Sequence, residues 1–194
     1  TDFEKDRMMA IRAEDQTVNA ALDGVRRYAA SMSTESMKKA EQKEARELTE
    51  YAIALETAGD IVATRLLSLA QEKSHEGIRL SKAGLDELSA LHQQVMDNMT
   101  LASNVLISGD MESARLLLEE KAEITKLERT SRKKHLKRLR DGLAESFDSS
   151  DLHLETLRCL KDFNSQIAAV AYPILHKGGQ LLETRLIENM EQTD

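Results

Sequence analysis

Apolar side chains recur along this chain at intervals of three and four residues, which places them on one face of an α-helix. The pattern predicts five long helices, over residues 2–32, 35–73, 81–107, 111–142 and 151–177. A short helix is expected to close the chain after Gly178 and Gly179, and the segment 146–151 is expected to be a loop. No strand or hairpin pattern occurs. The predicted fold is therefore all-α, an antiparallel helical bundle or two such bundles end to end.

The helix faces and ends can be predicted in more detail. The stripe of the first helix has one polar member, Asp15, and consists of Met8, Ile11, Asp15, Val18, Leu22, Val25, Ala29 and Met32. The stripe of the second helix is Leu48, Ala52, Leu55, Gly59, Val62, Leu66 and Leu69. The third helix is expected to turn Leu88, Leu91, Val95, Met99 and Ala102 inward.

Glycine, proline and aspartate mark where helices should begin, end or bend. Gly77 and Gly84 indicate a break between the second and third helices. Gly109 is a predicted C-cap and Asp110 a predicted N-cap for the next helix. Pro173 should kink the last long helix or end it early, because proline cannot donate a helical hydrogen bond.

Two segments of the chain, 53–69 and 158–175, resemble each other and indicate an internal repeat. The segments IALETAGDIVATRLLSL (53–69) and RCLKDFNSQIAAVAYPIL (158–175) share a skeleton in which Leu55 matches Leu160 and an Ala-rich turn follows. The period of about 105 residues suits a duplicated three-helix bundle. We expect residues 1–78 to form a first repeat with two long helices and residues 79–194 to form a second with three long helices plus the short one. A helix upstream of Thr1 would complete the first repeat, and the chain is expected to be a piece of a longer polypeptide.

Composition narrows the class of protein. The chain has 194 residues, one Pro, no Trp and 31% charged residues, which suits long solvated helices. Its net charge of −7 argues against a nucleic-acid partner, because nucleic-acid binders are basic. The lone Cys159 lies beside apolar positions and is expected to be a packing residue.

Two acids four residues apart, Glu56 and Asp60, stand in the second predicted helix with apolar neighbours above and below them. If the first two helices turn back near residue 35, Asp15 lies about level with them. Three converging carboxylates would need a cation, and all-oxygen ligands favour Mg, Ca, Mn or iron. Two alternatives stay open: exposed acids on the rim of the helix contact, and a buried Asp15 bonded to water.

The repeat predicts that only the first copy binds metal. The positions that correspond to Glu56 and Asp60 are Lys161 and Ser165 in the second copy. An ammonium group competes with a metal ion for the same oxygens. We therefore expect Lys161 to pair with Glu128 and the second copy to hold no metal.

The run RKKHLKRLR (132–140) is strongly basic. Cations at a helix C-terminus complement the helix dipole, so a solvated helix end is one interpretation. The other is a contact for anionic lipid or an acidic partner surface through Lys133, Lys134, Lys137 and Arg138.

The chain resembles the PhoU family over nearly its whole length. LETAGD (55–60) is similar to that family's Leu-Glu-Arg-Ile-Gly-Asp signature, a motif associated with metal binding. The stretches EKAEITKLERTSRKKHLKRL (120–139) and LKDFNSQIAAVAYPILHKGG (160–179) resemble the PhoU-like C-terminal cytoplasmic domain of bacterial sodium/phosphate cotransporters.

This resemblance implies a non-catalytic regulatory domain at the cytoplasmic face of the bacterial inner membrane. It would act on the membrane-embedded transporter half of the same polypeptide in phosphate transport and homeostasis, and a homodimer is compatible with it. Two alternatives remain: a free-standing PhoU-type regulator that bridges a phosphate ABC transporter and its sensor kinase, and a purely structural helical bundle.

Overall fold

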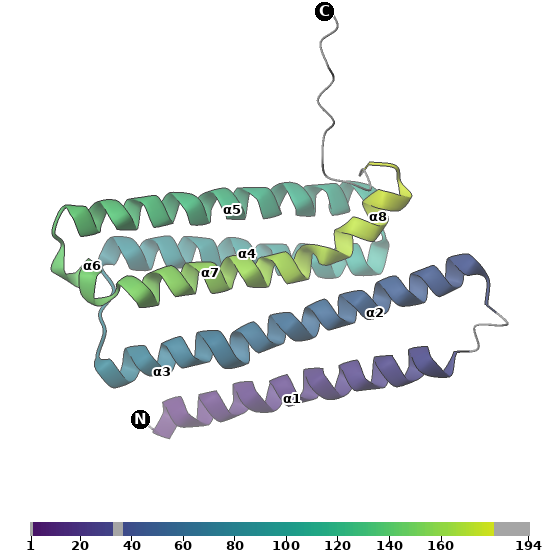
Figure 1. Cartoon of the computed structure of the whole chain (residues 1–194), viewed down its shortest axis with the longest axis horizontal. Coiled ribbons are helices and arrows are strands. Elements are labelled where there is room, and N and C mark those ends of the chain that lie inside the picture. Colours follow the sequence, from purple (N-terminus) through teal and green to yellow (C-terminus); the bar gives the residue numbers. More distant parts are fainter. Residues whose placement is uncertain (1, 33–36, 181–194) are drawn as a thin grey trace, which may run out of the picture.

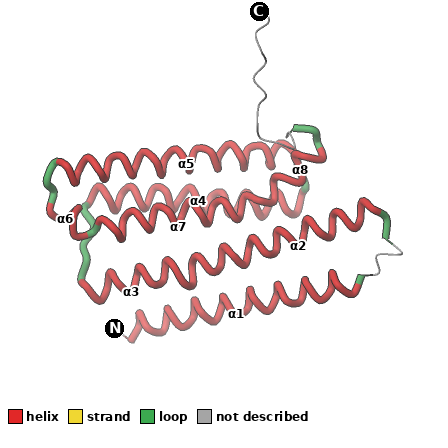
Figure 2. The backbone as a smooth tube through the Cα atoms, in the orientation of Figure 1, coloured by secondary structure: helices red, strands yellow, loops and turns green. Residues whose placement is uncertain are grey.

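The structure is a computed structural model that describes residues 2–32 and 37–180. Those residues form helices and connecting turns without a strand, which confirms the all-α prediction (Figure 2). In chain order the elements are α1 (Asp2–Ser31), α2 (Lys39–Asp60), the π-helix η1 (Ile61–Leu66), α3 (Leu67–Glu76), α4 (Lys82–Ser108), α5 (Met111–Arg140), α6 (Ala144–Asp148), α7 (Ser150–Ile167), the 3-10 helix η2 (Ala168–Val170) and α8 (Ala171–Lys177). No helix in these ranges is long and apolar enough to cross a membrane.

The helices form a hairpin and a bundle that lie side by side (Figure 1). In the hairpin, α1 runs back along α2 and η1. In the bundle, α4, α5 and α7 contact one another, and α8 covers the end at which α5 begins. The hairpin meets the bundle where α2 and η1 run along α7.

Two apolar clusters hold the bundle together. One cluster joins α2 to the bundle and includes Ala58, Val105, Leu117, Ile167 and Ala171. The other lies between α4, α5 and α7 and includes Leu88, Leu91, Val95, Ile124, Leu157 and Leu160. Cys159 is also fully buried, as predicted, and burial raises the pKa of its thiol.

Tyr51 fixes the α2–α7 contact. Its ring is buried, and its hydroxyl donates to the Ile167 carbonyl oxygen at 3.1 Å. Burial raises the pKa of Tyr51 to about 12, because the phenolate would lose its hydration. Ile167 is the last residue of α7, so the hydroxyl satisfies a carbonyl at a helix end.

The stripe of α1 is only partly covered. Leu22 is buried at 4% exposure, whereas Ile11, Val18 and Val25 are exposed at 36%, 37% and 38%. The difference arises because α1 packs mainly against one neighbour, α2, and lies at the outer edge of the structure (Figure 1).

Most predicted helix ends are confirmed. Gly109 ends α4 with a φ of 62°, and the Asp110 carboxylate accepts the Ser113 N–H at 2.8 Å. The break before Pro173 occurs at η2, three residues upstream, where the chain bends into α8 (Figure 1). The predicted closing helix lies outside the described residues.

Several expectations are wrong, and in α2 the predicted stripe residues Leu48 and Leu55 are 52% and 37% exposed. Gly84 lies inside α4, because the helix begins at the N-cap Ser81, whose hydroxyl accepts the Gly84 N–H. Met99 is 42% exposed, and the buried residue is Asn98, whose amide donates to Asn164 Oδ1 at 3.0 Å. The segment 146–151 is mostly helical, since α6 and the start of α7 lie in it.

Candidate functional site

The motif LETAGD occupies the last turns of α2 and leads directly into the π-helix η1. Glu56 is half-buried and Asp60 is exposed. A π-helix is rare, and π turns inside α-helices are frequent at functional sites. The motif therefore stands beside an unusual stretch of backbone that no pattern of apolar residues predicted.

Asp15 lies opposite the motif, across the α1–α2 hairpin. Its Oδ1 atom is 3.4 Å from the position that a Cβ atom on Gly59 would take. This oxygen is buried and has no hydrogen-bond partner, while Oδ2 accepts a long hydrogen bond from Asn19 at 3.4 Å. Because Gly59 has no side chain, the carboxylate of Asp15 can approach the α2 backbone closely.

The structure does not gather Asp15, Glu56 and Asp60 into a group of three possible ligands within the described residues. Among the described residues, no group of three or more His, Cys, Asp or Glu side chains could hold a metal ion. Asp15 offers one buried oxygen atom without a hydrogen-bond partner, and the side chain of Asp60 is exposed to solvent. The metal hypothesis thus remains a prediction.

A polar cavity of about 400 Å³ lies where the motif meets α7. It is lined by Thr57, Asp60, Ile61, Thr64, Arg65, Asp162, Ser165 and Gln166. Asp60 and Ser165 are equivalent positions of the predicted repeat, so the two copies of the motif line the same cavity. We call this set of residues the junction cavity.

Arg65 is the ionic link across the junction cavity. Its Nη1 donates to Asp162 Oδ2 at 3.1 Å, and its Nη2 lies 3.7 Å from Glu155 Oε2. The hydrogen bond with Asp162 raises the pKa of Arg65 above its ordinary value. The guanidinium therefore stays charged and holds η1 against two acids of α7.

The predicted pairing of Lys161 with Glu128 is wrong. Glu128 is buried, and its Oε1 accepts two hydrogen bonds from Arg132, at 3.0 and 2.6 Å. Arg132 lies one turn along the same helix, where side chains four residues apart are neighbours. The described partner of Lys161 is the adjacent Asp162, at 3.6 Å.

The basic run divides into exposed and buried cations. Lys133, Lys134 and Lys137 are exposed, as an anionic contact would require. Arg138 is different, because its guanidinium donates two hydrogen bonds to Glu87, at 2.9 and 3.0 Å, and its side chain is only 13% exposed. The prediction that Arg138 forms a surface contact is therefore wrong, because its side chain stabilises the fold by pairing with Glu87.

A buried polar cluster, which was not predicted from the sequence, surrounds Arg138 and Glu87. His135 and His153 are each 1% exposed, and their ring centroids are 4.6 Å apart. His153 Nε2 lies 3.6 Å from Glu87 Oε2, and His135 Nε2 is 3.0 Å from Ser150 Oγ. A signal was present, because Glu128, Ser131 and His135 continue the inward stripe of α5 at helical spacing.

Both histidines are neutral at pH 7. Burial, and after it the neighbouring His135, lowers the pKa of His153 to about 4. Burial, followed by the charge of Arg138, also lowers the pKa of His135. The only full charges in this cluster are therefore those of Arg138 and Glu87, which neutralise each other.

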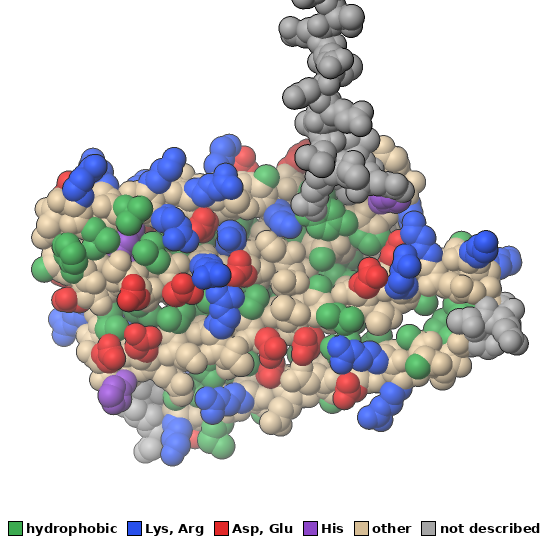
Figure 3. Space-filling model, in the orientation of Figure 1, with side chains coloured by type: hydrophobic (Ala, Val, Ile, Leu, Met, Phe, Trp, Pro, Cys, Tyr) green, Lys and Arg blue, Asp and Glu red, His purple; other side chains and the backbone are tan. Residues whose placement is uncertain are grey.

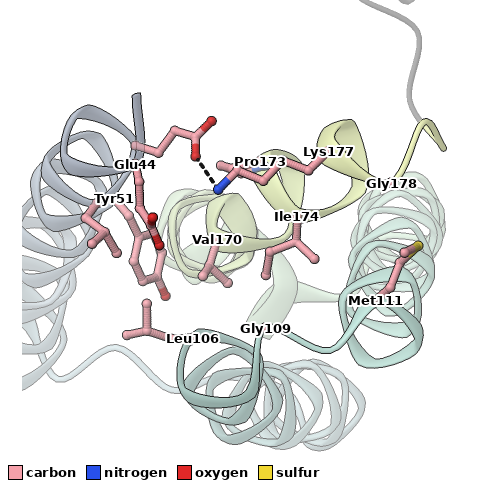
Figure 4. A pocket seen from close by; sticks show the side chains of 12 residues that line it. Glu44, Tyr51, Leu106, Gly109, Met111, Val170, Pro173, Ile174, Lys177 and Gly178 are labelled. Atoms are coloured by element: carbon pink, nitrogen blue, oxygen red, sulfur yellow. Dashed lines mark ion pairs between the residues drawn. The ribbon is translucent and has the colours of Figure 1, made fainter. Parts of the chain in front are cut away.

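A second cavity opens at the other end of α2 (Figure 4). Its volume is about 430 Å³, and its wall is mainly apolar, with Leu48, Tyr51, Val170 and Ile174. Lys177 at its rim lies 3.1 Å from Glu47 of α2, an ion pair that ties α8 to the hairpin. This cavity lies between the hairpin and the bundle, the same two parts of the fold that Arg65 of η1 connects.

Comparison with known proteins gives one group of relatives. The chain is 33% identical over 171 residues to the protein named "Putative inorganic phosphate export protein YjbB" from Salmonella typhimurium, with 88% of the chain and 32% of that protein covered. It is 32% identical over 160 residues to the protein of the same name from Escherichia coli strain K12, with 82% of the chain and 30% of that protein covered. The chain therefore spans about a third of the length of these relatives. No family model matches it, and no solved structure matches it significantly.

Proposed function

We propose that this chain is a non-catalytic, PhoU-like regulatory domain of a phosphate transporter, of the sodium-dependent type that the sequence resembles. The observation that carries the proposal is the similarity of most of the chain to one third of proteins named for phosphate export. The chain corresponds to about one third of the length of these relatives, which is a suitable size for a separate domain. We propose that this domain is joined to a membrane-embedded transporter domain and regulates it.

The junction cavity is the element through which we propose that regulation acts. It lies between the α1–α2 hairpin and the α4–α8 bundle, where Arg65 links the two by exposed to half-buried ion pairs beside the apolar cluster that joins α2 to the bundle. Such pairs contribute little to stability, about 0–1 kcal/mol, so they can rearrange at low cost. A change in the orientation of the α1–α2 hairpin relative to the bundle would then alter the surface that contacts the membrane-embedded transporter domain.

The test is phosphate efflux by the complete polypeptide in cells that lack their own exporters. Coupling free energies of 1–3 kcal/mol correspond to changes of about 5-fold or more. We expect Arg65→Glu to change the efflux rate by about that factor, because it places a third acid beside Asp162 and Glu155. Arg46→Glu is the matched control, since Arg46 is exposed on α2, which leads into η1, and its ion pair among the described residues is with Glu50 of the same helix.

Two results would contradict the proposal. One is an efflux rate that Arg65→Glu and Arg46→Glu change equally. The other is a coding sequence in which no membrane-spanning segments precede Thr1, which would favour the free-standing regulator. Metal binding is a separate prediction, which elemental analysis of wild type and of Glu56→Ala/Asp60→Ala would check.

A further inference from the structure

The outer face of the second half of α5 is basic. Arg129, Lys133, Lys137 and Arg140 are exposed and recur at intervals of three and four residues, so they share one face. Within the described residues none of them has an ion pair, whereas Arg132 and Arg138 turn toward buried acids of the bundle. Figure 3 shows Lys and Arg side chains along the edge of the molecule formed by α5.

Large apolar side chains are exposed at the same end. Leu136, Leu143 and Phe147 are 52%, 49% and 60% exposed. Leu136 lies among the cations of α5, and the other two follow within the turn and α6, which packs on α5. Exposed apolar groups rimmed by charge are typical of interaction sites. We call Lys133, Leu136, Lys137, Arg140, Leu143 and Phe147 the basic–apolar patch.

Nearby acids define the direction of approach. Asp141, Glu145 and Asp148 are exposed around α6. These acids flank Leu143 and Phe147 in sequence, so an anionic surface would be attracted by the row of cations on α5 and repelled by the acids at the α6 edge of the patch. The patch thus has the two features of a peripheral lipid contact, cations for headgroups and apolar side chains for the interface.

We propose that the basic–apolar patch docks on the surface of an anionic lipid bilayer. This inference rests on the proposed function, because a domain joined to a transporter is held next to the membrane. The overall net charge of −7 opposes such binding, so attraction to anionic lipid requires a local cluster of cations.

The test is sedimentation of the 194-residue chain with lipid vesicles. One set of vesicles contains equal parts of phosphatidylglycerol and phosphatidylcholine, and the other contains phosphatidylcholine alone. We expect binding to the first set only, and weaker binding as salt rises, because charges are screened over about 8 Å at physiological ionic strength. Each cation near such a surface contributes about fivefold to binding. The triple variant Lys133→Gln/Lys137→Gln/Arg140→Gln should therefore bind about a hundredfold more weakly.

Two further variants separate the contributions. Leu136→Ser/Phe147→Ser should weaken binding most at high salt, where insertion of apolar groups is what remains. Arg12→Gln/Arg27→Gln/Lys39→Gln is the matched control, since it removes three exposed cations from the hairpin and should bind like wild type. Far-UV circular dichroism checks that every variant is folded.

Three results would overturn the inference: no binding to either kind of vesicle, equal binding to both, or equal weakening by the patch and control triples. The first result would leave an acidic protein surface as the partner of the patch. The vesicle assay does not measure efflux. Vesicle binding without an effect of Arg65→Glu on efflux would contradict the proposed function and leave this inference standing.

Discussion

Replacing Arg138 by methionine is expected to lower the free energy of unfolding by about 3–5 kcal/mol. The substitution leaves Glu87 without its guanidinium partner in a position where its side chain is only 12% exposed. An unpaired buried charge is costly, since water has little access to it and the neighbouring His153 is neutral at pH 7. Urea denaturation followed by circular dichroism measures the change.

Two variants isolate the cause. Arg140→Met removes an exposed cation two residues away and should change stability by no more than about 0.5 kcal/mol. The double variant Glu87→Leu/Arg138→Met removes both charges and should recover most of the lost stability. If Arg138→Met is as mild as Arg140→Met, the pair is solvated and the cluster is not buried in solution.

Stability is expected to fall by about 3 kcal/mol between pH 7 and pH 4 through His153 alone. Its pKa is about 4 in the folded chain and 6.5 without burial. Between these values the unfolded chain binds a proton that the folded chain does not, so lowering the pH favours unfolding. The size follows from about 1.4 kcal/mol for each pKa unit. In the folded chain the added charge would face Arg138 and His135 of α5 as well as Glu87 of α4.

The measurement is a series of urea denaturations from pH 7 to pH 4. Carboxylates also titrate near pH 4. The informative quantity is therefore the difference between variants in how the free energy of unfolding changes with pH. His153→Gln should lose this part of the pH dependence, and His75→Gln, at an exposed position, should retain it. An NMR titration of the His153 ring in wild type gives a second reading. A midpoint near 6.5 would contradict the prediction.

The helices of the bundle could be predicted because apolar spacing reports directly on burial. Leu91, Val95, Leu157 and Ile167 are buried as their spacing indicates. Asn98 was missed, because a polar side chain breaks the apolar pattern while its partner, Asn164, is distant in sequence. The helix α6 was predicted to be part of a loop for another reason, since Ser and Asp occur often both in loops and at helix caps.

The candidate site could be predicted only in part. The motif and the approach of Asp15 to α2 follow from helix spacing and one turn near residue 35. The link from Arg65 to Asp162 depends on how the hairpin lies on α7, which no local pattern encodes. The histidine cluster likewise requires that α4, α5 and α7 meet at one point. The sequence therefore indicated the LETAGD motif and Asp15, whereas the roles of Arg65, His135 and His153 followed only from the packing.

The π-helix η1 also affects how this chain can change by insertion and deletion. A π turn holds more residues than an α turn, and its hydrogen bonds span five residues instead of four. Because a π turn absorbs one extra residue, loss of one residue within Ile61–Leu66 could restore a regular α-helix without rotating the segments on either side of it. Leu67, which is buried, would then keep its orientation. A residue lost within the regular turns of α2 or α3 would instead rotate everything after it by about 100°, so variation in length among homologous chains is expected in η1 and in the connecting turns.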